Sequence, residues 1–264
     1  MREIYKQKKW LYKIRFSTFM INCWLLFHPA IRRQLNRKKN FYLFVLKGIE
    51  SNNKLVFDVG ANEGFVTDIF LKLQYKVVAI EPDEDNLNIL RSRFKNNKNL
   101  TIEPFALGKQ DGAERIYTPL KQHALTTLSK KWKTIVESKQ HEDCDEFTKE
   151  EKYIQTTTLN KLIEKYGHPG YVKVDAEGYE SEILKGLSYS IPLLSFECIL
   201  PEFYQETLDC MRCLILINHA CTFNISVNNE FIFNEFVSHE IIQEKISYLS
   251  NITAEVFAKN DVST

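Results

Sequence analysis

The stretch KLVFDVGANEGFVTDIFLKLQYKVVAIEPD, residues 54–83, decides the fold of this 264-residue chain. An apolar run at 55–57 is too short for a helix and ends in the turn DVGANEG, which a helical pattern and a second apolar run follow. The order strand, turn, helix and strand is typical of an α/β unit that binds nucleotides at the carboxyl ends of its strands.

The turn itself predicts a nucleoside site. Gly60 lets the backbone turn sharply and approach a ligand, Gly64 opens the helix with little bulk, and the amides of Ala61 and Asn62 lie between them. The second strand, 76–80, ends in Glu81, which comes 21 positions after Gly60. An acidic residue at about that distance is the usual partner of ribose hydroxyls.

The spacing of the glycines distinguishes between nucleosides. A nicotinamide dinucleotide calls for GxGxxG, whereas this turn reads GxxxG with Asp58 two residues before Gly60. Asp58 suits a ligand with a cationic or amine-bearing tail, such as the methionine part of S-adenosylmethionine. We therefore favour the methyl donor over a dinucleotide and over a structural turn that binds nothing.

Six motifs in order and spacing resemble the FkbM family of S-adenosylmethionine-dependent methyltransferases. They are DVGANEG (58–64), AIEPD (79–83), PFALGKQDG (104–112), TTLNKLI (157–163), YVKVDAEGYESEILKGL (171–187) and LSFECILPEF (194–203). The resemblance implies a class I methyltransferase fold, S-adenosylmethionine as cofactor and, for many members, methyl transfer to a hydroxyl of a sugar or natural product.

We expect the donor site to extend to a third strand at 100–106, whose carboxyl end would lie beside the adenine if the sheet is parallel. Phe105 fits the core equally well. The expected donor-site residues are Asp58, Gly60, Ala61, Asn62, Gly64, Glu81, Pro82, Phe105 and Ala106.

The chemistry should lie at the end of a fourth strand, 171–174. Lys173 and Asp175 are two residues apart and share a face of the strand, and Glu177 follows just beyond. Two mechanisms fit. Either Asp175 or Glu177 accepts the hydroxyl proton while Lys173 holds its charge, or Asp175 and Glu177, with Glu197, bind a hard divalent cation. A purely structural pairing of Lys173 with a carboxylate is the remaining alternative.

His123 is a further candidate. It precedes a charged segment that could overhang the acceptor, and an imidazole titrates near neutral pH, so it could serve as the general base. A structural histidine fits the sequence as well. We keep His123 with Asp175, Glu177 and Lys173 as the expected catalytic residues.

Charge divides the chain into a basic arm and an acidic body. Residues 1–50 hold 12 Lys and Arg against 2 acidic residues, a net charge of +10, and the remainder carries −9. A basic arm indicates contact with something anionic, either a membrane surface or a polyanionic substrate, unless it is a solvated helical cap. Nucleic acid is disfavoured because the body is acidic and the only basic region precedes the fold.

Within the arm, residues 16–31 are uncharged and rich in large apolar side chains. A spanning helix needs roughly 20 such residues, and no small-residue cleavage site follows, so we expect neither a transmembrane segment nor a signal peptide. A helix packed on the domain and an interfacial membrane helix both remain. The expected division is a basic helical extension, 1–50, and a methyltransferase domain, 51–264.

The remaining pattern completes the fold. Strands at 193–197, 222–227 and 231–236, the last two joined by a turn at Asn228-Asn229, alternate with helices at 85–94, 159–166 and 204–217 and one starting at Ser238. This predicts a mostly parallel, seven-stranded Rossmann-like sheet with an antiparallel edge hairpin. The charged residues 130–152 should form a solvated loop or a substrate lid.

The six cysteines have no convincing disulfide or zinc spacing, which fits a reducing, cytoplasmic setting with membrane association through the arm as an option. We expect an O-methyltransferase that acts on a hydroxyl of a glycan, glycolipid or related small molecule. The alternative is an inactive nucleoside-binding protein that docks on a membrane through its basic arm.

Overall fold

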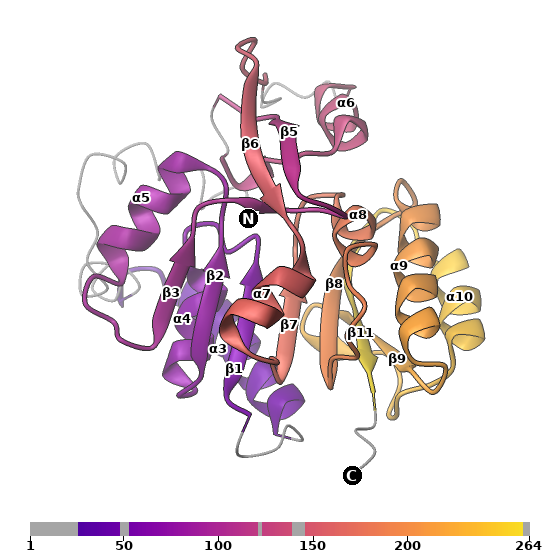
Figure 1. The fold of residues 1–264 in the computed structure, drawn as a ribbon. Helices are drawn as coiled ribbons and strands as arrows, with labels where there is room; N and C mark the ends of the chain where they lie inside the picture. Colours follow the sequence, from indigo (N-terminus) through magenta and orange to yellow (C-terminus); the bar gives the residue numbers. More distant parts are fainter. Residues whose placement is uncertain (1–25, 48–52, 121–122, 139–145, 261–264) are drawn as a thin grey trace.

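A computed structural model describes residues 26–47, 53–120, 123–138 and 146–260, and its centre is an eight-stranded sheet (Figure 1). Five parallel strands occupy one side, in the order β3 (Leu100–Glu103), β2 (Lys76–Ile80), β1 (Leu55–Val59), β7 (Tyr171–Val174) and β8 (Leu193–Leu200). Beyond β8 lie β11 (Ile252–Lys259), β9 (Thr222–Val227) and β10 (Glu230–Phe231), each antiparallel to the strand before it. The carboxyl ends of β1, β2 and β7 therefore meet at one edge.

Helices cover both faces because the strands are apolar on both. One apolar cluster joins the sheet to α3 (Pro29–Leu46), α4 (Phe65–Lys72) and α5 (Glu84–Arg93). The other joins it to α7 (Leu159–Tyr166), α8 (Glu180–Leu184), α9 (Tyr204–Ile217) and α10 (His239–Ser247). Along β7, Tyr171 faces the first cluster and Val172 and Val174 face the second, as alternation requires.

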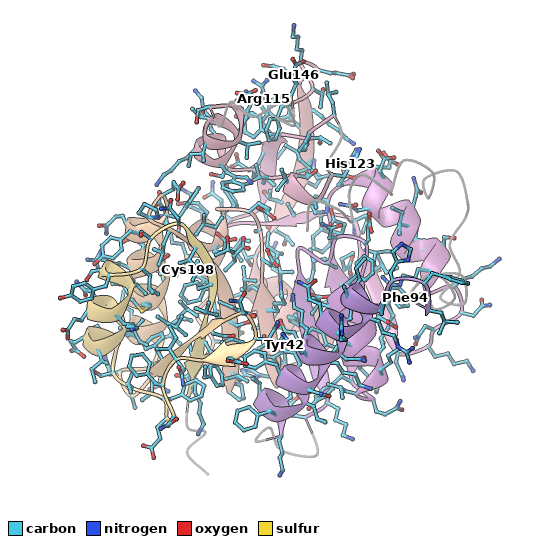
Figure 2. All side chains as sticks on the ribbon, turned by 180° about the vertical axis from the view of Figure 1, so that it is seen from behind. Tyr42, Phe94, Arg115, His123, Glu146 and Cys198 are labelled. Atoms are coloured by element: carbon cyan, nitrogen blue, oxygen red, sulfur yellow. The ribbon has the colours of Figure 1, made fainter. Side chains whose placement is uncertain are left out.

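A smaller unit stands over the carboxyl edge of the sheet, and we call it the cap (Figure 1). It consists of the described residues between 106 and 157: β4 (Ala106–Leu107), β5 (Gly112–Ile116), the short helix η1 (His123–Leu125), α6 (Lys130–Ser138) and β6 (Lys152–Thr157). β6 pairs with β4 on one side and with β5 on the other. Seen from behind, Arg115 and Glu146 lie in the cap at the far end from Tyr42 (Figure 2).

Most predicted elements are confirmed. The strands at 76–80, 171–174 and 222–227 and the helices at 159–166 and 204–217 have the predicted bounds. Gly167 ends α7 with a φ of 93°, and Ser238 precedes α10. The mostly parallel sheet with antiparallel strands beyond it is present as expected.

Four details differ. The third strand stops at Glu103, because Pro104 has no N–H to extend the ladder, and Ala106 joins the cap instead. The strand predicted at 231–236 is only β10, and residues 130–138 form α6 rather than loop. The sheet has eight strands rather than seven, because β11, which was not predicted, inserts between β8 and β9.

The described part of the basic arm contains the helix α3, which packs on the sheet. Phe41, Tyr42 and Leu46 are buried, and the Tyr42 ring lies 5.0 Å from that of Phe70 and 6.2 Å from that of Tyr171. Residues 1–25, which include most of the apolar stretch 16–31, and residues 139–145 of the charged segment 130–152 lie outside the described residues. In the ranges that are described, no helix has both the length and the apolar character needed to cross a membrane.

Candidate active site

The turn after β1 brings the first part of the site against the end of β7. The amides of Gly60 and Ala61 both donate to the carbonyl oxygen of Ile80 at 3.0 Å, and Gly60 has a φ of 76°. A Cβ at Gly60 would lie 1.7 Å from the carbonyl oxygen of Asp175. Gly60 is therefore required both by its backbone angle and by the close approach of two strand ends.

Gly64 has a similar constraint. It has a φ of 78°, and a Cβ there would lie 2.6 Å from side-chain carbon atoms of Leu90 and Phe94. The start of α4 is thus pressed against α5. Asn62 between the two glycines also has a positive φ, of 50°, and its Oδ1 accepts from the amide of Glu63 at 2.7 Å.

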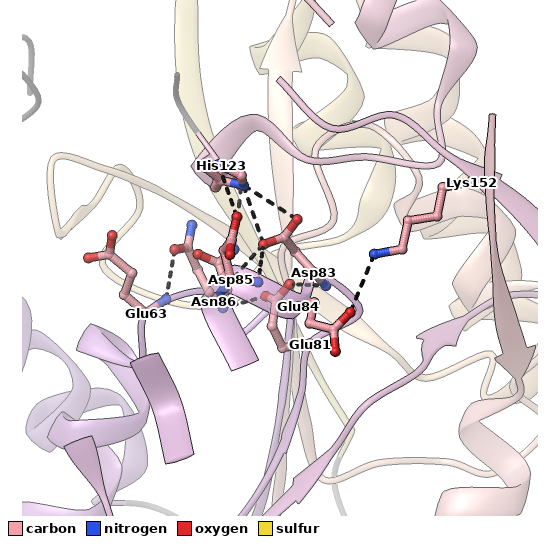
Figure 3. A network of polar contacts seen from close by, with 9 residues as sticks. Glu63, Glu81, Asp83, Glu84, Asp85, Asn86, His123 and Lys152 are labelled. Carbon is pink, nitrogen blue, oxygen red and sulfur yellow. Dashed lines mark hydrogen bonds and ion pairs between the residues drawn. The ribbon is translucent and has the colours of Figure 1, made fainter. Parts of the chain in front are cut away.

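Glu81 closes the same turn from the end of β2 (Figure 3). Its Oε2 accepts from the amide of Asn62 at 2.7 Å and its Oε1 from the amide of Asp83 at 2.8 Å. The side chain is 4% exposed, and burial raises the pKa of Glu81 to about 7 in spite of these hydrogen bonds. Each carboxylate oxygen keeps a lone pair that a ribose hydroxyl can use.

Asp58 also has one carboxylate oxygen that is available to accept a hydrogen bond. Thr67 Oγ1 donates to Asp58 Oδ2 at 2.6 Å, whereas the buried Oδ1 has no hydrogen-bond partner among the described residues. Burial raises the pKa of Asp58, and the nearby Lys173 ammonium opposes that shift. Since buried polar atoms rarely stay unpaired, an amine-bearing ligand such as the methionine part of S-adenosylmethionine fits this oxygen.

The second part of the site is the turn after β7. Lys173 is 4% exposed, and its Nζ lies 2.5 Å from Asp175 Oδ2. Asp175, Glu177 and Glu197 each have a carboxylate oxygen within 4.8 Å of the others' oxygens. Glu180 supports the turn, because its Oε1 accepts from the amides of Ala176 at 2.8 Å and Gly178 at 3.3 Å.

Charge separates the roles of these carboxylates. Burial alone would raise the pKa of Asp175, but the Lys173 ammonium lowers it below its usual value. Burial and the charge of Asp175 raise the pKa of Glu177 and Glu197 well above theirs. The site therefore holds one carboxylate with a lowered pKa beside two whose affinity for a proton is raised.

Lys173 is the buried cation whose charge keeps the pKa of Asp175 low. Burial would lower its pKa, but the carboxylates of Asp175, Glu255 and Asp58 raise it. Glu255 comes from β11, and its Oε1 accepts from Ser195 Oγ at 2.6 Å and from the Tyr42 hydroxyl at 3.2 Å. Glu255 was not among the expected site residues, although ITAEVFAK, residues 252–259, alternates with the period of two that marks a strand.

The cap contacts the turn after β7, residues 175–178, directly. Thr127 Oγ1 donates to the carbonyl oxygen of Glu177 at 2.8 Å, where Glu177 has a φ of 52°. Below it, a Cβ at Gly178 would lie 2.5 Å from the Phe203 ring, and that ring lies 6.0 Å from the ring of Trp132 in α6. Neither Thr127 nor Trp132 was among the expected site residues.

His123 lies beside Asp83 and Asp85, just after the end of β2 (Figure 3). Its Nδ1 is 3.4 Å from Asp83 Oδ1, and its Nε2 is 3.4 Å from Asp85 Oδ2. Burial would raise the pKa of Asp83, but the contact with His123 helps to lower it. His123 thus connects the cap to the start of α5.

The remaining expected donor residues are spread along the β2 and β3 ends. Pro82 is half-buried between Glu81 and Asp83. Phe105 packs against the core beneath α7, where it lines an open pocket of about 440 Å³ with Thr157 and Lys161. Ala106 is buried in β4. A contact of Phe105 or Ala106 with adenine stays a prediction.

Comparison with protein families decides the class. The model of the methyltransferase FkbM domain matches residues 58–239, which is more than half of the chain and includes both turns. The chain belongs to the FkbM methyltransferase family. It is therefore an S-adenosylmethionine-dependent methyltransferase, and the eight-stranded sheet is the Rossmann-like class I fold with antiparallel C-terminal strands.

Solved methyltransferase structures share a distant likeness to this FkbM protein. The plantazolicin methyltransferase BpumL in complex with SAH has a TM-score of 0.43 and 8% identity over 98% of this chain and 99% of that chain. A precorrin-6y C5,15-methyltransferase from Geobacter metallireducens has a TM-score of 0.43 and 11% identity over 83% and 88%. A SAM-dependent methyltransferase from Archaeoglobus fulgidus has a TM-score of 0.40 and 13% identity over 90% and 99%. No curated protein sequence matches significantly.

Proposed function

We propose that this FkbM methyltransferase transfers the methyl group to a hydroxyl of a glycan, glycolipid or related small molecule. The observation that carries the proposal is the group of three carboxylates, Asp175, Glu177 and Glu197, within 4.8 Å of one another and against the donor turn. An alcohol loses its proton on methylation, so a site for this reaction needs a nearby group that can take it.

The donor fits the first turn. Bound there, S-adenosylmethionine supplies an electrophilic methyl group on a sulfonium. Glu81 would hold the ribose hydroxyls, and the unpaired Oδ1 of Asp58 would accept from the amine. Gly60 lets the donor turn lie directly on the backbone of Asp175, which brings donor and acceptor sites together.

Glu177 is the proposed general base. Its raised pKa makes it a stronger base than Asp175, whose pKa Lys173 lowers. With the donor bound, Glu177 would take up the proton that the acceptor hydroxyl loses as it becomes methylated. Asp175, kept ionised by Lys173, orients the hydroxyl. His123 would act through Asp83 on the donor side instead.

A divalent cation is the alternative way to activate the hydroxyl. Asp175, Glu177 and Glu197 offer the oxygen ligands that Mg²⁺ prefers, and their spacing supports this arrangement. Bound there, the cation would stabilise an alkoxide, and the same three residues would then be ligands rather than bases.

The cap supports an acceptor rich in hydroxyl groups. Two buried polar atoms near the Trp132–Phe203 ring pair have no hydrogen-bond partner among the described residues, Trp132 Nε1 and Glu206 Oε2, and Lys131 bridges Glu206 to the Phe203 ring. An aromatic ring beside polar groups offers both an apolar face and hydrogen bonds, the combination that a sugar ring matches.

The first experiment is calorimetric titration with S-adenosylhomocysteine and, in parallel, NAD, each with and without Mg²⁺. We expect micromolar binding of S-adenosylhomocysteine alone. Labelled methyl transfer to oligosaccharide and glycolipid acceptors then tests the acceptor class, and dependence of that transfer on Mg²⁺ would favour the cation over Glu177 as the activating group.

Substitution at the catalytic turn tests the roles. Glu177→Gln and Asp175→Asn should each lower turnover by roughly 100-fold or more while S-adenosylhomocysteine still binds. Glu182→Gln, two residues beyond Glu180 on α8, is the matched control and should stay active. Binding of S-adenosylhomocysteine without transfer to any hydroxyl acceptor would instead support the inactive nucleoside-binding protein.

A further inference from the structure

Helix α3 has a buried face and an exposed face, and on the exposed face Phe44 makes one ring contact, with Phe231 at 6.3 Å between centroids. Tyr42 and Leu46 are buried against the sheet, and Leu35 is half-buried on the same side. Arg33, Arg37 and Phe44, at spacings of four and seven residues, are exposed on the opposite side. The outward face therefore combines guanidinium groups with a large aromatic ring.

Four large apolar side chains of this region are exposed to solvent. Phe27 is 81% exposed, Phe44 67%, Leu26 64% and Leu43 54%. Residues 26–47 also contain six Lys and Arg and no acidic residue, a net charge of +6. We call Leu26, Phe27, Arg33, Arg37, Leu43 and Phe44 the α3 patch. Apolar side chains within a strongly basic surface are the composition of interfacial helices that lie on anionic membranes.

The N-terminal 25 residues of the chain have the wrong charge to neutralise this patch. They contain six Lys and Arg and one Glu, a net charge of +5. An anionic partner complements the patch, whereas that segment would add like charge. A nucleic acid would meet the charges but would leave the aliphatic Leu26 and Leu43 without a matching surface, so a lipid surface fits the whole patch better.

Leu26, at the N-terminal end of the patch, lies near the start of α4. Leu26, Arg32 and Leu35 line a cavity of about 240 Å³ together with Phe65 and Asp68 from the start of α4. The donor turn, 58–64, leads directly into α4. A membrane that contacts the N-terminal end of α3 would thus lie on the side of the molecule where α4 begins, directly after the turn 58–64.

We propose that the α3 patch docks the protein on an anionic lipid membrane, with the basic side chains at the headgroups and Phe27 and Phe44 at the acyl boundary. This docking does not depend on the identity of the methyl acceptor. It would bring the enzyme to acceptors that are carried by the membrane, because a docked enzyme meets them at high effective concentration.

The test is co-sedimentation of the full chain with vesicles of phosphatidylcholine alone and of phosphatidylcholine with about a third phosphatidylserine. We expect binding to the anionic vesicles only, and weaker binding as salt is raised. The double variant Arg33→Glu/Arg37→Glu should weaken that binding at least tenfold. Phe27→Ala/Phe44→Ala should also weaken it at least tenfold, with salt dependence retained.

The matched control variants carry the same kinds of charge reversal and apolar truncation at exposed positions outside the α3 patch. Lys95→Glu/Lys98→Glu, at exposed positions beyond α5, and Tyr248→Ala, 77% exposed at the end of α10, should bind vesicles as the natural chain does. Thermal unfolding and S-adenosylhomocysteine binding report whether each variant is folded. Those readouts also separate a failure of methyl-donor binding from a failure of docking.

Three results would overturn the proposal. They are equal binding to neutral and anionic vesicles, equal loss in the α3 variants and the controls, and binding to polyuridylate that exceeds vesicle binding and is lost in the same α3 variants. The last result would assign the patch to nucleic acid.

Discussion

Glu81 is a carboxylate whose own turn already holds it in place. Two backbone amides donate to it, at 2.7 and 2.8 Å, so the side chain is oriented before any ligand arrives. Burial nevertheless raises its pKa to about 7, which places its protonation within the physiological range. We therefore expect donor binding to depend on pH through Glu81.

We expect Glu81→Gln to weaken S-adenosylhomocysteine binding at least tenfold, on the order of the 1.5 to 3 kcal/mol of a hydrogen bond to a charged group. For the natural protein, affinity should fall as pH is lowered through about 7, because the neutral carboxyl loses its charge-assisted bonds. Calorimetry across pH measures both effects, and the exposed neighbour Glu84, changed to Gln, is the control. An unchanged affinity in Glu81→Gln would remove Glu81 from the donor site.

The same group affects the stability of the free protein. The pKa of Glu81 is raised from its ordinary 4.5 to about 7, so the folded state binds the proton more tightly than the unfolded state. The stability that the folded state gains from this tighter proton binding is fully present below about pH 4.5 and is lost as the pH rises through about 7. Urea midpoints of the natural chain and Glu81→Gln should therefore diverge between pH 5 and pH 8, with the natural chain losing more. Parallel pH profiles would contradict the assignment.

Lys173 is the residue on which the neighbouring carboxylates depend. Its removal in Lys173→Met would leave Asp175, Glu255 and Asp58 without their buried cation, a loss on the order of 3 to 5 kcal/mol. Urea unfolding measures it, with the exposed Lys76→Met as control. Adding Asp175→Asn should recover part of the loss, since one uncompensated charge is then gone; an additive double variant would show that the two residues act separately.

At the scale of elements, the turn after β1 depends on a backbone contact with β7. Gly60 and Gly167 both have positive φ angles, 76° and 93°, but only Gly60 has a neighbour in the way of a Cβ. The two glycines therefore separate the cost of a left-handed backbone from the cost of a collision with another strand.

Gly167→Ala should destabilise the protein by about 1 to 3 kcal/mol, because its backbone, with φ 93° and ψ 172°, lies in a region that residues with a side chain rarely adopt. Gly60→Ala carries that cost and also pushes against the Asp175 carbonyl, so we expect a larger loss of stability and of S-adenosylhomocysteine binding. Urea unfolding and calorimetry measure the pair. Equal losses in the two variants would mean that the turn and the β7 end can move apart freely.

At the scale of the whole molecule, α3 belongs to the core of the sheet although its sequence belongs to the basic arm. Phe41, Tyr42 and Leu46 are all buried, and Tyr42 reaches Glu255 of the C-terminal strand, 213 positions away. The expected boundary at residue 50 thus divides residues that pack together.

A chain that starts at residue 51 should consequently fail to fold cooperatively. Burial of three such side chains is worth about 5 to 9 kcal/mol, which is comparable with the whole stability of a domain. Circular dichroism and urea unfolding measure the effect, and a chain that starts at residue 26, with α3 intact, is the control. Cooperative unfolding of the shorter chain would restore residues 51–264 as an independent domain.

The sequence by itself determined the elements whose signals are local. The apolar runs, glycines and caps between residues 54 and 83 and between 157 and 187 carry their own periodicity, so strands, turns and helices followed from them. Asp175, Glu177 and Glu197 were also predicted as one group, because parallel strands place their carboxyl ends at the same edge.

Only the tertiary structure decided the contacts between distant segments. His123 contacts Asp83 and Asp85, Thr127 donates to the Glu177 carbonyl oxygen, and β11 brings the charge of Glu255 close to Lys173. None of these follows from spacing, because the segments that meet are separated by 37 or more positions and their approach is set by packing of the cap and of the antiparallel edge. Local periodicity fixes the elements, whereas the burial of their faces against one another fixes the site.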